Sequence, residues 1–325
     1  MTAQIRSKAL ALAAVLAATT LAACGGDDSS NSGAKAGNSA DSRAAADKII
    51  GQAVAANDKA SSASIDGTID ITVKGVPRFK EPIQVTASGD YNQPAGADVP
   101  DFNVDVGLGL NGGTIGGGLV LAHGKGFITL GDTGYPLPAN INSKIAKPAA
   151  DAKNGLTKTA AMFYINPQDW QKNAQLVGDA RVAGEDTDHI KADIQPDKFF
   201  ADIARLVNLL TALRVTQAVA LPEHLSAPAR AALVRSTTLA KGEVWIGKQD
   251  HVLRKATLQG AIKVASKDRK VLGGVTGGTL KATVNVSEVG TQHKISAPKQ
   301  LGSYSALQLS LDALGEFARR AAGKK

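Results

Sequence analysis

The sequence predicts an α+β fold in which an antiparallel sheet has one apolar face and helices accompany it. Apolar and polar residues alternate cleanly in three consecutive runs early in the chain, and the alternation returns in its last third. This period-two pattern with a single apolar face is typical of antiparallel strands that are covered on one side. Between the two blocks, residues 197–217 carry apolar side chains at helical spacing, which predicts a helix.

The N-terminus has the features of a lipoprotein signal peptide. Arg6 and Lys8 precede an apolar run at 9–23, and the sequence Leu-Ala-Ala-Cys, typical of a bacterial lipobox, ends at Cys24. An uncleaved membrane anchor is disfavoured, because the run is shorter than the ~20 residues that a spanning helix needs. We therefore expect Cys24 to be lipidated by acyl chains such as palmitate. The mature protein would then be held at the extracytoplasmic face of the cell membrane, since buried acyl chains bind it strongly.

Composition supports an exported, tethered domain. Residues 25–42 contain no bulky apolar side chain and are expected to form a flexible tether that spans ~20–25 Å. The chain has 37 basic and 29 acidic residues, an excess that favours anionic lipid headgroups. We expect no nucleic-acid partner, because the chain is predicted to be exported and only 4% of its residues are aromatic. Its single cysteine is used by the anchor, so the folded part is expected to contain no disulfide.

The folded part is expected to begin with a helix and continue into strands. An amphipathic helix is predicted at 44–56, with Asp41 or Ser42 as its N-cap. A tight turn is predicted at His123 and Gly124, between the last two strands of the first block. The alternation predicts the strands of this block at 63–74, 79–91, 102–110, 115–122 and 125–130.

The middle of the chain is expected to be mainly helical. Residues 136–155 lose the alternation and are predicted as loop with a short helix. A short helix that holds Trp170 is predicted at 167–177, the clearest helix at 197–217 and a second one at 222–238.

Further strands are predicted at 181–194, 242–246, 251–264 and 280–286. They are followed at 304–320 by a basic amphipathic helix that packs on the domain or lies on a membrane surface.

Catalytic and metal-ligating motifs are not convincing in this sequence. Residues 107–112 match Gly-x-Gly-x-x-Gly, but alternating strand sequence surrounds them and no helix follows, so a β-hairpin is favoured over a dinucleotide site. The five histidines are scattered singly, which does not fit metal-ligand spacing. Glu185, Asp186 and Asp188 are able to bind a cation, although a turn is the simpler interpretation. We therefore predict no enzyme, no metal and no cofactor. An exported hydrolase is the weakest alternative, because it would need a converging Asp/His/Ser cluster.

The helix predicted at 197–217 is the main functional feature after the lipobox. Its wide apolar stripe has a simple interpretation, namely that it covers the sheet as part of a filled core. Alternatively, it lies over a curved sheet with incomplete filling and leaves a cavity for an acyl chain. The residues that we expect to line such a cavity are Met162, Phe163, Phe199, Phe200, Ile203, Leu206, Val207 and Leu210, with Met162 and Phe163 near its mouth.

The order of these features has a counterpart in a known protein family. Lipobox, tether, helix, alternating strands, central helical insertion and further strands follow one another, and the segments that carry the resemblance are 61–72 (SSASIDGTIDIT), 85–91 (VTASGDY), 182–194 (VAGEDTDHIKADI), 196–203, 244–246 and 251–258. Over residues 44–298 the chain resembles the LppX/LprG group of actinobacterial lipoproteins in the LolA-like superfamily. The Gly-rich hairpin and the C-terminal helix depart from the pattern of that group.

The resemblance implies a half-barrel, which is a strongly curved antiparallel sheet with helices over its concave face. It also implies that lipids, lipoglycans or acylated molecules bind in the apolar hollow between sheet and helices, and it supplies no catalytic residue. The expected parts of the chain are a signal peptide at 1–23, a tether at 24–42, a LolA/LppX-like lipid-binding domain at 43–300 and a basic amphipathic helix at 301–325.

The expected function is that of a membrane-anchored lipoprotein that binds or transfers lipids or acylated glycolipids, with a transporter as a further partner. The alternative is a structural or regulatory envelope lipoprotein with a fully packed core, which acts through protein–protein contacts. A ligand cavity or co-purified lipid would separate these two functions.

Overall fold

The computed structural model describes residues 39–57, 59–77, 79, 81–110, 113–151, 166–212 and 224–321. The strands in chain order are β1 (Ser62–Lys74), β2 (Ile83–Asn92), β3 (Asp101–Leu110), β4 (Gly113–Ala122), β5 (Lys125–Leu130), β6 (Thr133–Pro136), β7 (Gln171–Val182), β8 (Glu185–Ile194), β9 (Thr237–Gly247), β10 (Leu253–Lys263), β11 (Gly277–Ser287) and β12 (Gln300–Leu301). The helices are α1 (Ser39–Asn57), α2 (Ala139–Asp151), the 3-10 helix η2 (Pro167–Asp169), α4 (Pro196–Ala212), α6 (Ala227–Ser236), α7 (Ser266–Arg269) and α8 (Tyr304–Ala321).

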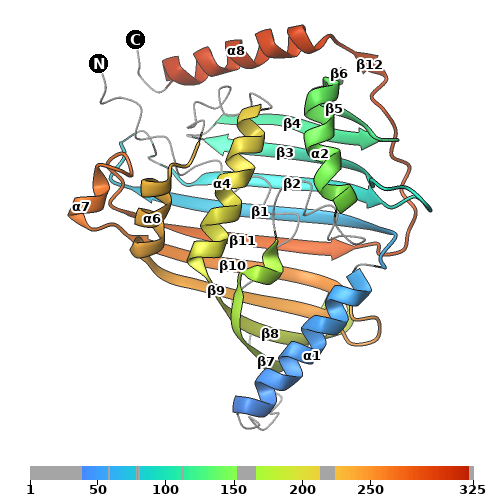
Figure 1. The fold of residues 1–325 in the computed structure, drawn as a ribbon, viewed down its shortest axis with the longest axis vertical. Coiled ribbons are helices and arrows are strands. Elements are labelled where there is room, and N and C mark those ends of the chain that lie inside the picture. Colours follow the sequence, from blue (N-terminus) through green and yellow to red (C-terminus); the bar gives the residue numbers. More distant parts are fainter. Residues whose placement is uncertain are drawn as a thin grey trace.

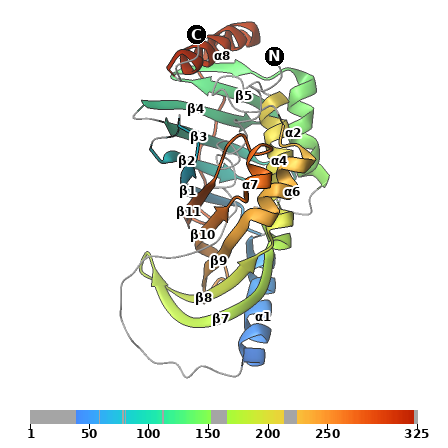
Figure 2. The same ribbon diagram turned by 90° about the vertical axis from the view of Figure 1, so that its left-hand side faces the viewer.

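The twelve strands of the described residues form one sheet, in the order β12-β6-β5-β4-β3-β2-β1-β11-β10-β9-β8-β7. Neighbouring strands are antiparallel except β12 and β6, which run parallel. Helices α1, α2, α4 and α6 lie on one side of the curved sheet (Figures 1 and 2). The predicted α+β class with a curved antiparallel sheet is therefore confirmed.

The two predicted blocks of strands meet at the centre of this sheet. Strand β1 pairs with β2 on one side and with β11 on the other, so Ile69 lies between Val85 and Ala282. All three side chains are buried on the face that the helices cover. The alternation in each block therefore produces a single continuous apolar surface, although its halves lie far apart in the sequence.

Helix α4 closes the main core, and α1 covers a smaller one. Ile203 and Leu206 of α4 are buried against the sheet within the main cluster. Beneath α1, a second cluster contains Ala46, Ile190 and Ile246. Because burial of one large aliphatic side chain contributes about 1.5–3 kcal/mol, these helices are held mainly by their apolar faces.

Two tight turns each place both of their residues at positive φ. His123 (φ 50°) and Gly124 (φ 73°) connect β4 to β5, as the sequence predicts. Ala183 (φ 50°) and Gly184 (φ 88°) connect β7 to β8 in the same way. Two-residue hairpins with positive φ at both positions match the twist of the flanking strands.

The helix predicted at 167–177 is wrong. Only Pro167–Asp169 forms a helical turn, and Gln171–Val182 forms strand β7 at the edge of the sheet. Its pairing with β8 shifts register twice, between Lys172 and Gln175 and again before Gly178. Burial still alternates along β7 from Ala174 to Val182, but three of its inward positions, Ala174, Gly178 and Ala180, carry small side chains. The apolar alternation that reveals a strand in a sequence is therefore weak here.

Several element boundaries also differ from the prediction. Helix α1 begins at Ser39, so Asp41 and Ser42 lie inside the helix and neither is its N-cap. Ser226 caps α6 by accepting a hydrogen bond from the Ala229 amide, and Thr237 already belongs to β9. The second strand begins at Ile83 rather than at 79, and the sequence did not predict β6, β12 or α7. Residues 213–217 of the predicted central helix lie outside the described residues.

The C-terminal helix α8 packs near the β6 edge of the sheet (Figure 1). Leu307 and Leu311 are buried in the main core, whereas Leu309 on the opposite side of the helix is exposed. No helix in the part of the chain that the structure describes is long and apolar enough to cross a membrane.

Candidate functional site

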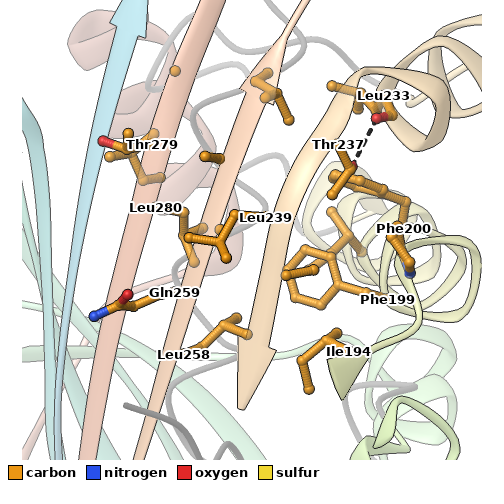
Figure 3. Close-up of a pocket in the computed structure, with 18 of the residues that line it drawn as sticks. Ile194, Phe199, Phe200, Leu233, Thr237, Leu239, Leu258, Gln259, Thr279 and Leu280 are labelled. Atoms are coloured by element: carbon orange, nitrogen blue, oxygen red, sulfur yellow. Dashed lines mark hydrogen bonds between the residues drawn. The ribbon is translucent and has the colours of Figure 1, made fainter. Parts of the chain in front are cut away.

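A hollow lies between the sheet and helices α4 and α6 (Figure 3). Its cavity volume is about 90 Å³. Strands β1, β11, β10 and β9 form its floor, and α4 and α6 form its wall. None of the described residues that line it is charged, and the lining residues of polar type are Thr72, Thr237, Gln259 and Thr279.

The hollow exists because its floor lacks side chains at its centre. Gly260 of β10 pairs with Leu280 of β11 and with Ala240 of β9. A Cβ atom at Gly260 would lie 3.8 Å from the Leu280 Cβ and 3.9 Å from the Leu239 carbonyl oxygen, which are ordinary contact distances. A side chain would therefore fit at Gly260, and the space it would take is open to a ligand.

A second glycine of the floor, Gly278, lacks a side chain for a different reason. A Cβ atom at Gly278 would lie 2.4 Å from the Thr72 carbonyl oxygen, closer than real Cβ atoms approach. Gly278 is therefore required by the close approach of β1 and β11. Of these two glycines, only Gly260 leaves room for added atoms.

Two aromatic side chains of α4 form the wall opposite this floor. Phe199 and Phe200 are partly buried, and their ring centroids lie 5.2 Å apart in an edge-to-face arrangement. Phe199 also meets Trp170 edge to face, with 5.0 Å between the ring centroids. In Figure 3, both phenylalanines lie on the helix side of the hollow. Edge-to-face contacts restrict ring orientation, so this wall is ordered.

A buried carboxylate holds the wall in place. Asp202 of α4 accepts hydrogen bonds from the Trp170 indole Nε1 at 2.9 Å and from the Asn166 amide at 2.7 Å, and it forms an ion pair with Arg205. Because Trp170 is fully buried, these bonds fix its ring against Phe199. Asp202 therefore attaches the N-terminal half of α4 to the segment that leads into β7.

The Thr237 hydroxyl, beside the α6 wall, already uses its hydrogen-bond donor. Thr237 donates a hydrogen bond from its hydroxyl to the Leu233 carbonyl oxygen at 2.9 Å (Figure 3). Because alternate residues of a strand point to opposite faces, Gln259 and Ala261 point away from α4 while Gly260 faces it. The hollow is therefore suited to an aliphatic chain rather than to a polar headgroup.

The residues predicted to line a cavity fall into three groups. Phe199, Phe200 and Ile203 line the hollow. Leu206, Val207 and Leu210 are buried further along α4 and do not line it. The remaining sequence-predicted site residues, which lie outside the described part of the chain, are Met162, Phe163 and the lipidation candidate Cys24.

Sequence reasoning missed the floor of the hollow. Leu258, Gly260 and Ile262 all line it and share one face of β10. The signal for it was the glycine itself, which interrupts an otherwise apolar alternation between Leu258 and Ile262. An isolated glycine within a strand pattern marks a place where something approaches the backbone closely.

A polar cluster lies on the other face of the sheet. His189 hydrogen-bonds to Glu243, whose second carboxylate oxygen lies 2.9 Å from the Lys191 Nζ. The imidazole stacks on Trp245 at 4.5 Å, and the Lys255 Nζ lies 5.0 Å from the Trp245 ring. Burial lowers the pKa of His189 below its usual value, although the hydrogen bond to Glu243 acts in the opposite direction. These groups bind one another and lie outside the hollow.

The acidic residues near the start of β8 also have cationic neighbours. Glu185 forms an ion pair with Arg254 at 2.5 Å, and Asp186 lies 3.6 Å from Arg181. Asp188 lies 3.8 Å from the Lys248 Nζ. No group of three or more His, Cys, Asp or Glu residues in the described ranges is arranged to hold a metal ion. The three acidic residues thus belong to the hairpin and its ion pairs.

Comparisons with family models and with curated proteins found no match for this chain. Among solved structures, LprF from Mycobacterium bovis is similar to it with a TM-score of 0.41 and 11% identity, over 78% of this chain and 97% of that one. The lipoprotein LppX from Mycobacterium tuberculosis has a TM-score of 0.38 and 13% identity, over 78% and 99% of the two chains. A LolA superfamily protein from Nitrosomonas europaea has a TM-score of 0.22 and 8% identity, over 77% and 94%. These likenesses concern the fold alone.

Proposed function

We propose that this protein is a membrane-anchored extracytoplasmic lipoprotein that binds or transfers lipids or acylated glycolipids. The observation that carries the proposal is the uncharged hollow whose floor is open at Gly260 and whose wall is formed by Phe199 and Phe200. Cys24 at the end of the lipobox supplies the anchor. Because α1 begins at Ser39, we place the tether between Cys24 and that residue.

The energetics favour an acyl chain as the bound group. Burial of each methylene contributes about 0.8 kcal/mol, and none of the described residues that line the hollow carries a charge that such a chain would desolvate. A polar headgroup, in contrast, would lose hydrogen bonds to water, and the Thr237 hydroxyl has no donor left to offer it because its proton is bonded to the Leu233 carbonyl oxygen. The ligand therefore enters with its chain, and its headgroup stays in solvent.

The size of the hollow sets a condition on binding. A volume of about 90 Å³ is well below the ~300–1,000 Å³ typical of sites for drug-sized ligands. In this conformation the hollow accepts only a segment of a chain, and a longer chain requires α4 or α6 to move outward. Such opening costs part of the binding free energy, so affinity depends on how firmly Asp202 and Trp170 hold α4.

Native mass spectrometry with organic extraction tests the proposal. The full chain, expressed in a lipoprotein-exporting bacterial host, is expected to carry an acylated molecule or to take up added phospholipid. A Gly260→Leu variant places a side chain in the open space and is expected to lose most of this uptake while it still folds.

The matched control is Gly116→Leu. Gly116 lies in β4 and is exposed, and a Cβ atom added there would have only the Val106 carbonyl oxygen nearby, at 3.9 Å. This variant adds the same side chain to the sheet outside the hollow, so uptake should match that of the parent. A clean apo mass with no uptake by the parent chain would contradict the proposal and favour the structural or regulatory role. Equal loss in both glycine variants would place the ligand elsewhere.

A further inference from the structure

One end of the sheet displays a concentrated group of cations. Lys74 is the last residue of β1 and Lys263 the last of β10, and both pair with Gly277 of β11. Because adjacent strands lie ~4.8 Å apart, the two lysine Cα atoms are separated by about 10 Å. Helix α7 and the turn after it add three more cations directly beyond β10. We define the α7 patch as Lys74, Lys263, Lys267, Arg269 and Lys270, all of which are exposed.

Few acidic residues balance this charge. In the described parts of the β1–β2 and β10–β11 connections, the acidic residues are Glu81 and Asp268. Asp268 is buried, and its carboxylate forms an ion pair at 2.7 Å with Arg235 of α6, which is not part of the patch. The α7 patch therefore keeps a strong net positive charge.

The cations project from an ordered turn. The Gly274 amide donates a hydrogen bond to the Arg269 carbonyl oxygen at 2.8 Å, and Leu272 and Val275 are each 1% exposed within the main core. The Asp268–Arg235 ion pair joins the same turn to α6. The patch is consequently pre-organised, so binding an extended anionic surface orders little additional chain.

The patch lies at the same end of the sheet as the hollow. Ile262 and Gly278 line the hollow, and each is one residue away from the Lys263–Gly277 pair. Arg235, which holds α7, lies between the lining residues Leu233 and Thr237. Figure 1 shows α6 and α7 side by side at this end of the sheet, next to α4.

We infer that the α7 patch docks the protein on an anionic phospholipid membrane and places the hollow beside the lipids. A membrane fits better than a single bound phosphate, because the five cations are spread over one exposed end of the sheet. The large exposed apolar residues of the described chain (Val177, Leu239, Leu301 and Leu309) lie outside the patch, so the contact is electrostatic and does not insert. Docking on the membrane goes beyond the proposed function and does not require a lipid in the hollow. Only the idea that docking helps to load the hollow with lipid rests on the proposed function.

Vesicle co-sedimentation tests the docking. The full chain with Cys24→Ser carries no acyl anchor, and its N-terminal segment is common to all variants. It is expected to bind vesicles of phosphatidylcholine mixed with phosphatidylglycerol more tightly than vesicles of phosphatidylcholine alone. The triple variant Lys267→Gln, Arg269→Gln, Lys270→Gln should lose at least tenfold in affinity for the anionic vesicles, since each cation near such a surface is worth about fivefold. At ~1 M salt, where the Debye length is ~3 Å, parent and variant should bind alike.

The control removes the same charge from the opposite end of the sheet. Lys125 follows the β4–β5 turn, and Lys294 and Lys299 follow β11, where all three side chains are exposed. The triple variant Lys125→Gln, Lys294→Gln, Lys299→Gln should bind anionic vesicles within about twofold of the parent, because these cations lie more than a Debye length from the docked surface. Far-ultraviolet circular dichroism and thermal unfolding check that both triple variants fold.

Equal weakening in both triple variants would overturn the inference, because it would show a dependence on net charge alone. Binding of a soluble anionic polysaccharide without binding of anionic vesicles would also overturn it, and would assign the patch to an envelope polymer. Lipid uptake is measured separately by native mass spectrometry. If the parent docks but takes up no lipid, the docking stands and the proposed lipid-binding function fails; if it takes up lipid but does not dock, the reverse holds.

Discussion

The two halves of helix α4 lie over different parts of the sheet and have different surroundings. The N-terminal half, with Phe199 and Ile203, borders the hollow above β9, β10 and β11. The C-terminal half, with Leu206 and Leu210, extends toward β1, β2 and β3, where its side chains are fully buried (Figure 1). One apolar stripe thus borders a hollow at one end of the helix and completes a packed core at the other.

The strands beneath the helix account for this difference. Under the N-terminal half, the inward positions include Ala240, Gly260 and Gly278. Toward the C-terminal half, the inward positions of the first block are large, and Ile83 and Val85 are buried there. The side chains of the facing strands, rather than the helix, therefore decide whether a cavity forms beneath α4.

The largest effect should come from the packed half. Leu206→Ala removes a side chain that is 0% exposed, and we expect it to lower the free energy of unfolding by about 2–5 kcal/mol. Phe200→Ala, at the hollow, should cost less than about 2 kcal/mol, because Phe200 is only partly buried and truncation enlarges an existing space. Urea denaturation of both variants measures the difference. Equal losses would show that the two halves are packed alike.

The two glycines of the floor, Gly260 and Gly278, should respond to substitution in opposite directions. Gly278→Ala should lower the free energy of unfolding by about 1–3 kcal/mol, because the new Cβ atom would overlap the Thr72 carbonyl oxygen. Gly260→Ala should raise it by about 0.5–1 kcal/mol, because its Cβ atom fits and the unfolded chain loses freedom. Opposite signs in thermal or urea unfolding would support an open floor at Gly260 alone. Destabilisation by both changes would mean that the floor at Gly260 is already closed.

The sequence predicts the parts of this arrangement that depend on local pattern. The alternation of Ile65, Ile69 and Ile71 with polar residues identifies β1, and the helical spacing of Phe199, Ile203 and Leu206 identifies α4. Strand β7 escaped prediction because its inward positions include Ala174, Gly178 and Ala180, whose small side chains give only a weak apolar alternation. Local pattern carries information about which face of an element is apolar, and for these elements that information was sufficient.

The division of α4 into two halves depends on pairings between distant segments. Phe199 and Leu206 belong to the same stripe in the sequence, and nothing local separates them. What separates them is that Gly260 is paired with Leu280 and Ala240, which requires the register of β9, β10 and β11. For the same reason, the sequence suggested Leu206 and Leu210 as cavity residues, whereas the structure favours Gly260 as the position at which to fill the hollow.

The smallest effect concerns His189 of β8, on the face of the sheet away from α4, where a change should leave the hollow unaltered. The folded structure lowers the pKa of His189, mainly through burial, so the unfolded chain binds a proton more readily than the folded one. Stability should therefore fall as the pH decreases through the ordinary pKa of histidine, about 6.5, and this contribution should be fully present above it.

His189→Gln keeps a hydrogen-bond donor for Glu243 but does not titrate, so it should flatten that part of the stability profile. The measurement is urea unfolding of parent and variant between mildly acidic and neutral pH. Lipid uptake at neutral pH should be the same in both, because the imidazole stacks on Trp245 on the face away from α4. If His189→Gln altered lipid uptake as strongly as Gly260→Leu, lipid binding in the hollow would depend on both faces of the sheet. The side chains beneath α4 would then no longer be sufficient to explain why the hollow forms and binds lipid.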